Sequence, residues 1–443
     1  MQITLPWGNE SFDLDLPPTW NVLFPKPQEA LPTSSTSEAA VVADALARPV
    51  EAKALADHDL AGKNVLVIVD DNTRPTPAYR FFHLILETLQ TAGADLGRVT
   101  LLTALGIHTP MSADEVKQKV GAENLEKIDW ENHDAFDPNA GVHMGETSRG
   151  TPVSLNRRVK EADLIILVGL IEPHLMAGFG GGMKNILPGV ASAQTIGAHH
   201  ELLTRPPYQA NRVGMMPEAN DFRLDLEEIR AMIPAGIFCI NVVLDHRGAI
   251  TACFAGDPVA AHRRGVAYTR RFFGVSMDRP VDGVITNSFP MEINFKQSMK
   301  CVGNALPAVR PGGAVMGFLR ADRGLDDIPM PDGSPLPLPA VKAILRAIGP
   351  SRVYGLLNLA KKGLDIEEKF LYYYTLQLVR GYDIFLYVPS LTDEIVKKLF
   401  FFKGECSDPA RVIAMGVKKL GKQATVAVFP NGGSTFPILK SNR

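Results

Sequence analysis

The sequence predicts an α/β protein with two α/β domains, mostly parallel sheets, and a cofactor and substrate cleft between the domains. Apolar runs of strand length alternate with segments of helical periodicity, which is the pattern of βαβ units. Three of these runs end in polar loops, and a glycine-rich turn follows the third. The length of 443 residues suits two or three domains of ~100–200 residues. We place the boundary near residue 275, giving domains 1–275 and 276–443, and the final segment is free to pack back on the first domain.

The first half begins with a predicted hairpin over residues 2–15, which turns at Gly8 and Asn9. Ser37 is placed to cap a helix over residues 38–47. Four later apolar runs are bounded by turn formers and predict buried strands, at residues 64–70, 98–104, 163–169 and 236–245. Helices are predicted over residues 78–92 and 256–274.

In the second half of the chain, predicted strands also alternate with predicted helices. We expect strands at residues 281–287, 313–318, 352–358, 383–388 and 423–429. We expect helices at residues 294–300, 341–348, 393–402 and 408–420. Residues 322–339 form a loop rich in Pro, Gly and Asp, long enough to suggest a functional element.

Composition excludes several classes of protein. A hydrophobic content of 46% and a charged content of 21% suit a globular core. The net charge of −2 gives no basic footprint for nucleic acid. No apolar run reaches the ~18 residues of a membrane span, and the N-terminus lacks the basic and apolar regions of a signal peptide. Four cysteines without a CxxC pair predict neither disulfides nor a zinc site, so we expect a cytoplasmic protein.

Polar side chains follow three predicted strands of the first half. Asp71 and Arg74 follow the first, His108 follows the second, and Glu172 with His174 follows the third. Ligands of open α/β sheets bind beyond the carboxyl ends of strands, so these loops are expected to converge on one crevice. The planar guanidinium of Arg74 suits a carboxylate or phosphate, although a surface ion pair with a neighbouring aspartate is an alternative. For His108 the alternative is a loop-capping role.

A glycine-rich turn leads from the third strand to a lysine. The turn contains Gly178, Gly180, Gly181 and Gly182, and Lys184 follows it. Glycines let the backbone approach an anion, and free N–H groups bind it. Many such turns in α/β proteins bind nothing, and a single lysine is usually solvated. The additional histidines, up to the pair at positions 199 and 200, favour a site.

Five motifs in a fixed order resemble the nickel-pincer-nucleotide-dependent lactate racemase family. They are Asp71-x-Thr73-Arg74-Pro-x-Pro, Gly106-x-His108-x-Pro, Glu172-Pro-His174, Gly178-Phe-Gly-Gly-Gly-Met-Lys184, and Pro188-Gly followed by His200. The match runs from about residue 60 to residue 200. It continues more loosely through Pro290, Gln297, Lys300 and the closing Pro-Asn-Gly-Gly at 430–433.

The resemblance implies racemisation or epimerisation of a 2-hydroxy acid, either lactate-like or larger or more acidic. The hydrogen on the substrate Cα would move as a hydride to a nickel-pincer nucleotide, a pyridinium-3-thioamide-5-thiocarboxylic acid mononucleotide carrying nickel. Lys184 would hold this cofactor covalently, and His200 would be the nickel ligand, with His199 as its competitor. Thr73 and the four glycines would complete the cofactor site, with the cofactor phosphate at the 178–182 turn.

The resemblance also assigns the substrate side of the site. His108 and His174 would accept and donate the hydroxyl proton, one on each face of the substrate. Arg74 and Lys300 would anchor the carboxylate. Gln297 would hydrogen-bond a substrate oxygen, and Asp71 would orient Arg74 or a histidine. The implied partners are the maturation enzymes, namely a carboxylase/hydrolase, a sulfur insertase and a nickel insertase.

The chain departs from the family pattern on the Gln297 helix. Lys296 stands where an aromatic residue is expected, with Phe295 one position earlier. An extra cation would suit a larger or more acidic substrate, and the alternative is a lysine that points into solvent. One alternative function is a lyase or dehydratase on the same fold. Another is a non-catalytic nickel or nucleotide carrier, which would not need His108, His174 and Arg74. A conventional dehydrogenase is disfavoured because no GxGxxG follows the first strand.

Overall fold

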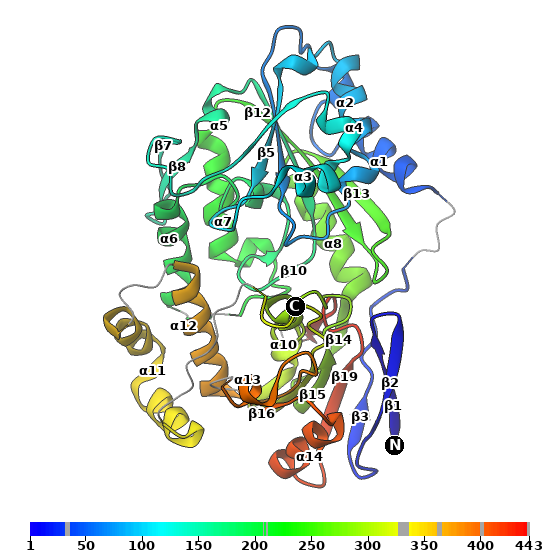
Figure 1. Ribbon diagram of the computed structural model, residues 1–443, viewed down its shortest axis with the longest axis vertical. Helices are drawn as coiled ribbons and strands as arrows, with labels where there is room; N and C mark the ends of the chain where they lie inside the picture. The colour runs from blue at the N-terminus through cyan, green and yellow to red at the C-terminus, as the bar shows by residue number, and fades with distance from the viewer. Residues whose placement is uncertain are drawn as a thin grey trace.

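The computed structural model describes residues 1–31, 36–206, 208–209, 211–326, 336–360, 366–398 and 403–440. Within these residues the chain forms two six-stranded sheets, one in the upper and one in the lower half of Figure 1. Helices pack against both. The expected α/β fold with mostly parallel sheets is therefore confirmed.

The upper sheet has the strand order β13-β12-β9-β4-β5-β6. Its strands are β13 (Ile250–Gly256), β12 (Gly236–Leu244), β9 (Leu164–Leu170), β4 (Val65–Asp70), β5 (Val99–Ala104) and β6 (Asp129–Asn132). All neighbours are parallel except β12 and β13. Every residue of β4 and β9 is buried, as expected for parallel strands covered by helices on both faces.

The helices of the upper half divide between the two faces of this sheet. Apolar residues of α1 (Glu38–Ala47) and α2 (Phe82–Thr91) share a core with Val65, Val67 and Val69. Those of α5 (Arg157–Glu161), α6 (Ala193–Glu201) and α7 (Asp221–Glu228) share a core with Leu66 and Ile68. The alternating side chains of β4 therefore serve two separate cores.

The lower sheet is parallel throughout, in the order β18-β17-β16-β15-β19-β3. Its strands are β18 (Lys403–Glu405), β17 (Asp383–Tyr387), β16 (Val309–Phe318), β15 (Val281–Asn287), β19 (Thr425–Phe429) and β3 (Asn21–Leu23). The predicted hairpin of β1 (Gln2–Trp7) and β2 (Glu10–Asp15) packs with α14 (Pro409–Leu420) on one face. The helices α10 (Lys300–Ala305), α11 (Leu338–Ala360) and α12 (Ile366–Gly381) pack on the other.

The two halves are joined at several points. β14 (Gly274–Met277) pairs with β20 (Phe436–Leu439), and the ring of Phe436 lies edge-on to Phe179, with centroids 5.5 Å apart. One hydrophobic core contains residues of both sheets. The division at residue 275 stays a prediction. β3 pairs with β19, so the N-terminal strands lie with the lower sheet.

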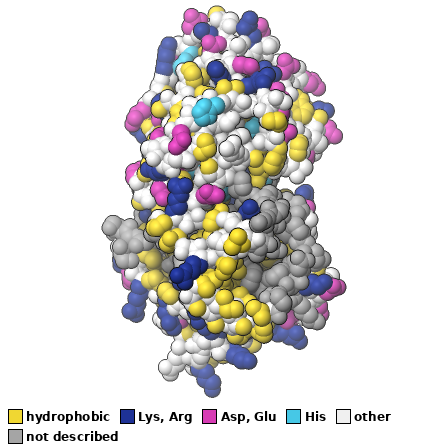
Figure 2. All heavy atoms as spheres, turned by 90° about the vertical axis from the view of Figure 1, so that its left-hand side faces the viewer, with side chains coloured by type: hydrophobic (Ala, Val, Ile, Leu, Met, Phe, Trp, Pro, Cys, Tyr) yellow, Lys and Arg dark blue, Asp and Glu magenta, His cyan; other side chains and the backbone are white. Residues whose placement is uncertain are grey.

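Smaller elements complete the fold. They are α3 (Ala113–Val120), α4 (Ala122–Leu125), β7 (Gly141–Glu146), β8 (Pro152–Asn156), β10 (Pro173–His174), β11 (Gly178–Phe179), α8 (Ala260–Phe273), α9 (Phe295–Ser298) and α13 (Asp393–Lys398). None of the described helices is long and apolar enough to cross a bilayer. Figure 2 shows the face that carries α11 and α12, where acidic and basic side chains are interspersed.

The strand expected at residues 352–358 is wrong. These residues belong to α11, which is kinked at Gly349, where φ is +74°. Val353 and Leu357 are buried and four residues apart, a helical spacing that a short apolar run conceals. Residues 327–335 of the loop expected at 322–339, and the end of the helix expected at 393–402, lie outside the described residues.

Candidate active site

The three strands that end in polar loops are neighbours in the upper sheet, in the order β9-β4-β5. Beyond their carboxyl ends, the Nδ1 atom of His108 lies 2.6 Å from Oδ2 of Asp71. The other oxygen of Asp71 accepts hydrogen bonds from the backbone N–H (3.1 Å) and the hydroxyl (2.6 Å) of Thr73. Burial alone would raise the pKa of Asp71, but His108 and Arg74 outweigh it and lower this pKa to about 2. Asp71 is therefore an anion that orients His108.

A second charge cluster joins the two halves of the molecule. Oε1 of Glu172 lies 3.6 Å from Nε of Arg74 and 3.1 Å from Nζ of Lys300, which belongs to α10 beside the lower sheet. Burial raises the pKa of Glu172, but the two cations outweigh it and keep the group ionised. The Oε2 atom is buried and has no hydrogen-bond partner among the described residues. Two cations and a free acceptor thus meet where the substrate carboxylate was expected.

A buried lysine forms hydrogen bonds with the backbone of the loop that carries Asp71 and Arg74. Lys119 on α3 donates to the backbone carbonyls of both residues at 2.9 Å and lies 2.8 Å from Oδ1 of Asp70. Oδ2 of Asp70 accepts a hydrogen bond from the hydroxyl of Thr76 at 2.5 Å. The loop conformation therefore depends on a charge that the sequence analysis did not identify.

His174 is buried on β10, at the start of the glycine-rich segment. Its Nδ1 accepts the backbone N–H groups of Met176 and Ala177, both at 3.2 Å, so the ring proton lies on Nε2. Burial, together with the positive charges of Lys184, Arg74 and Lys300, lowers the pKa of His174 well below its ordinary value. His174 is thus a neutral imidazole that exchanges its proton only through Nε2.

The glycines of the turn are required by packing within the chain. A Cβ atom on Gly178 would lie 2.5 Å from the Met215 carbonyl, and one on Gly181 would lie 2.7 Å from Oδ1 of Asn241. Gly180 and Gly182 are similarly close to the carbonyls of Leu170 and Pro258. The N–H groups of Gly180 and Gly182 donate to the Glu172 carbonyl and to Asn241, so they do not face the expected phosphate.

Lys184 lies on a short 3-10 helix, Gly182–Asn185, directly after this turn. Its side chain is half-buried, and within the described residues no hydrogen bond or ion pair holds its amine. Burial and the positive charges of Arg74 and Arg223 lower its pKa well below the ordinary value. An amine in this state is a nucleophile.

The two adjacent histidines on α6 have different environments. His199 is fully buried, its Nδ1 lies 2.7 Å from Asp225, and its Nε2 is buried without a hydrogen-bond partner among the described residues. His200 is half-buried, with Nδ1 2.7 Å from the Ile196 carbonyl. In both residues the Nδ1 contact leaves Nε2 as the nitrogen suited to a metal. His200 stays the predicted ligand, and His199 stays its competitor.

The second half supplies two further expected residues. Gln297 on α9 is buried, and its Oε1 has no hydrogen-bond partner among the described residues. Lys296 beside it is half-buried. The structure describes no group of three or more His, Cys, Asp or Glu side chains able to hold a metal.

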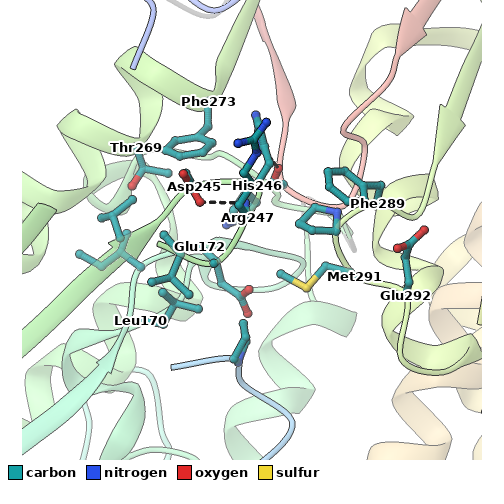
Figure 3. Close-up of a pocket in the computed structure, with 18 of the residues that line it drawn as sticks. Leu170, Glu172, Asp245, His246, Arg247, Thr269, Phe273, Phe289, Met291 and Glu292 are labelled. Carbon is teal, nitrogen blue, oxygen red and sulfur yellow. Dashed lines mark hydrogen bonds between the residues drawn. The ribbon is translucent and has the colours of Figure 1, made fainter. Parts of the chain in front are cut away.

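A cavity of about 780 Å³ lies between the two halves, beside the charge cluster. Glu172 and Pro75 line it from the upper half, and residues 289–292 line it from the lower half (Figure 3). The lining does not include His108, His174 or Lys184. The cavity thus adjoins Arg74 and Lys300 on the Glu172 side.

Sequence reasoning missed the residues that hold the site in place, namely Lys119, Arg223, Asp225 and His262. All four are buried, and two of them lie on α7. A charged residue on the buried face of an amphipathic helix was the available signal, because Phe222 and Leu226 are buried beside Arg223.

Comparison with known proteins agrees with this geometry. The family "Lactate racemase N-terminal domain" matches residues 7–211. A lactate racemase of Thermoanaerobacterium thermosaccharolyticum is 32% identical over 318 residues, which cover 71% of this chain and 73% of that protein. The chain belongs to the lactate racemase family. A lactate racemase of Lactiplantibacillus plantarum is 31% identical over 65% of this chain and 68% of its own length.

The fold extends this relationship over the whole chain. The lactate racemase apoprotein structure of T. thermosaccharolyticum superimposes with a TM-score of 0.81 and 25% identity, covering 99% of this chain and 100% of that chain. A Thermotoga maritima structural-genomics protein shares the fold with a TM-score of 0.62 and 17% identity, covering 90% of this chain and 97% of its own.

Proposed function

We propose that this member of the lactate racemase family racemises or epimerises a 2-hydroxy acid. The family relationship supports a substrate of the lactate type. The observation that carries the proposal is the convergence of the paired Asp71 and His108 with the cluster of Arg74, Glu172 and Lys300. The first pair is suited to proton transfer, and the second cluster is suited to binding a carboxylate.

Arg74 and Lys300 bind the substrate carboxylate. They come from opposite halves of the molecule and already meet at Glu172, so the carboxylate is held by both halves. Gln297, whose buried Oε1 has no hydrogen-bond partner among the described residues, donates a hydrogen bond from its side-chain N–H to a substrate oxygen. These contacts fix the Cα–H bond in one orientation, which is the main requirement for a stereochemical reaction.

The two histidines move the hydroxyl proton. His108 takes the proton on Nε2 while the Asp71 carboxylate stabilises the resulting imidazolium. The His108 imidazolium returns the same proton when the hydroxyl forms again, so the charge balances over a turnover. His174, whose Nδ1 accepts two backbone N–H groups, donates a hydrogen bond from Nε2 to the substrate oxygen on the other side of the planar keto acid and so assists the transfer.

The residues present fit the nickel-pincer nucleotide. The amine of Lys184, which has no hydrogen bond or ion pair within the described residues, is available for covalent attachment. His200 or His199 provides an imidazole nitrogen, which suits nickel. Thr73 and the glycine turn lie in the surrounding loops. When bound, this cofactor supplies the acceptor that takes the substrate hydrogen as a hydride and returns it. Maturation would require the carboxylase/hydrolase, sulfur insertase and nickel insertase expected from the resemblance.

The first test is the intact mass of the protein after co-expression with such maturation enzymes. We expect an added mass corresponding to the nickel-bearing nucleotide, mapped to Lys184, together with interconversion of D- and L-hydroxy acids. Lys184→Ala should lose both. An adduct that persists in this variant would refute the assignment, and Lys127, an exposed lysine changed to alanine, is the matched control. Identification of the product separates racemisation from the elimination of water expected of a lyase or dehydratase.

The histidine assignments have a separate test. His108→Ala and His174→Ala should keep the adduct on Lys184, because neither residue holds the cofactor. Each should lower kcat by about 10²–10⁴-fold, which is the usual contribution of general acid–base catalysis. Racemisation rates in both directions measure this effect. If either variant keeps nearly full kcat with normal occupancy, that histidine is not a proton-transfer group.

A further inference from the structure

Arg223 is a fully buried arginine that the proposed reaction does not use. It lies on α7 with a side chain that is 0% exposed. Its closest carboxylate, Glu227, is 3.9 Å away and is already paired with Arg263 at 2.7 Å. Burying a guanidinium without a close counter-ion is costly, so a compensating set of contacts is expected.

Within the described residues, the hydrogen bonds of Arg223 all go to carbonyls of the segment before Lys184. Nη1 donates to the Gly181 carbonyl at 3.1 Å, Nη2 donates to the Phe179 carbonyl, and Nε donates to the Ala177 carbonyl at 3.5 Å. The carbonyl between two of these, on Gly180, accepts from Nε2 of the buried His262 at 2.9 Å. Consecutive carbonyls of the turn are thus held from two sides.

We propose that Arg223 is a positioning residue for Lys184, fixing the turn that presents the Lys184 amine and placing a positive charge close to that amine. The planar guanidinium is suited to this task because its three N–H directions match three alternate carbonyls. Lysine has no such fork. This inference rests on the proposed attachment of the cofactor to Lys184 and adds the residue that prepares the amine.

The chemistry explains the need for a nearby positive charge. In the attachment reaction the amine of Lys184 adds to the carbon of a thiocarboxylic acid. The N–C bond forms, the C–O bond breaks, and the hydroxyl leaves as water with one proton from the amine. Only the unprotonated amine reacts, and neighbouring cations favour that form. The charged groups that act on Lys184 are three cations and one carboxylate, namely Arg74, Arg223, Lys300 and Glu172, with the imidazoles of His174 and His199 also in range.

The test measures the reactivity of Lys184 in the unloaded full-length protein. N-hydroxysuccinimidyl acetate acetylates the amine, releasing N-hydroxysuccinimide and a proton, and peptide mapping follows Lys184 and the exposed Lys53 in one sample. In the wild type, the pH midpoint for Lys184 should lie below that for Lys53. In Arg223→Met it should rise by about one pH unit or more, because one adjacent cation has been removed.

Two further variants separate charge from geometry. Arg223→Lys keeps the charge but cannot hold three carbonyls, so the midpoint should stay low while adduct occupancy after co-maturation falls. Arg223→Gln removes the charge but keeps a polar side chain at this position, so the midpoint should rise as in Arg223→Met. It provides the test if Arg223→Met does not fold.

Either of two results would overturn the inference. One is a folded Arg223→Met with the wild-type midpoint and wild-type adduct occupancy. The other is wild-type adduct occupancy in a folded Arg223→Lys, because lysine cannot hold three carbonyls. If the wild-type protein takes up no adduct but the midpoints shift as expected, the role of Arg223 stands and the proposed cofactor is wrong.

Discussion

At the residue scale, the glycine-rich turn shows that one sequence pattern can arise from packing or from ligand binding. Gly181 has φ of +76°, and a Cβ atom there would meet Asn241 at 2.7 Å and Ile171 at 3.1 Å. Gly62 has a similar φ of +70° with nothing within 4 Å. A side chain at Gly62 would meet backbone strain alone, whereas a side chain at Gly181 would meet both backbone strain and steric overlap.

Changing each of these glycines to alanine gives a direct comparison. Gly62→Ala should lower the free energy of unfolding by about 1–2 kcal/mol, the usual cost of a left-handed residue with a side chain. Gly181→Ala should cost about 1–3 kcal/mol more, because it also overpacks a buried site. Urea unfolding measures both values. An equal loss in the two variants would show that the turn has room for side chains.

At the element scale, α3 connects the loop after β4 to the body of the upper half. A capping box between Ser112 and Glu115 begins this helix, and Lys119 on its last turn holds the carbonyls of Asp71 and Arg74. Among the described residues, the carboxylate paired with Lys119 is that of Asp70, 2.8 Å away, so the two charges depend on each other.

Lys119→Met should destabilise the protein by about 3–5 kcal/mol, since it leaves Asp70 as a buried, unpaired charge. The double variant Lys119→Met, Asp70→Asn removes that charge and should recover part of the loss. Its binding of the substrate carboxylate should remain weaker than in the wild type, because no lysine holds the backbone carbonyl of Arg74. The weaker binding should appear as a higher KM. Urea unfolding and steady-state kinetics give the two readouts. If the double variant is no more stable than the single one, the charge pair is not the cause.

The secondary-structure elements differ in how well the sequence predicts them. Continuous apolar runs such as Val65–Asp70 and Leu164–Leu170 are buried on both faces, so their strands and the loops beyond them were correctly expected. The motif residues were found because their chemistry lies in the side chain itself. The Arg223 contacts were not predictable, since they go to backbone carbonyls 42–46 residues away. The strand expected at 352–358 failed because apolar spacing alone does not fix the period of a short run.

At the scale of the whole molecule, buried histidines occur throughout the upper half, and a half-buried one lies beside the cavity. Burial is the leading cause that lowers the pKa of five of them, namely His133, His174, His199, His246 and His262. Unfolding returns each to its ordinary value of ~6.5. Below that pH the unfolded chain binds protons that the native protein excludes, so native stability is lost as the pH falls.

We therefore expect the free energy of unfolding to be nearly constant from pH 8 to 7 and to fall between about pH 6.5 and 5, by up to about 1.4 kcal/mol per pH unit for each histidine. Carboxylates with a lowered pKa, such as Asp71 at about 2, act in a separate window, because their contribution is lost only below about pH 4. Urea unfolding across this range measures the slope. His262→Gln should make it shallower, whereas His143→Gln, on an exposed position of β7, is the matched control. A wild-type stability that stays constant from pH 7 to 5 would show that these imidazoles are protonated in the native protein. His174 would then not be neutral, and the proposed proton transfer, which depends on a neutral His174, would be contradicted.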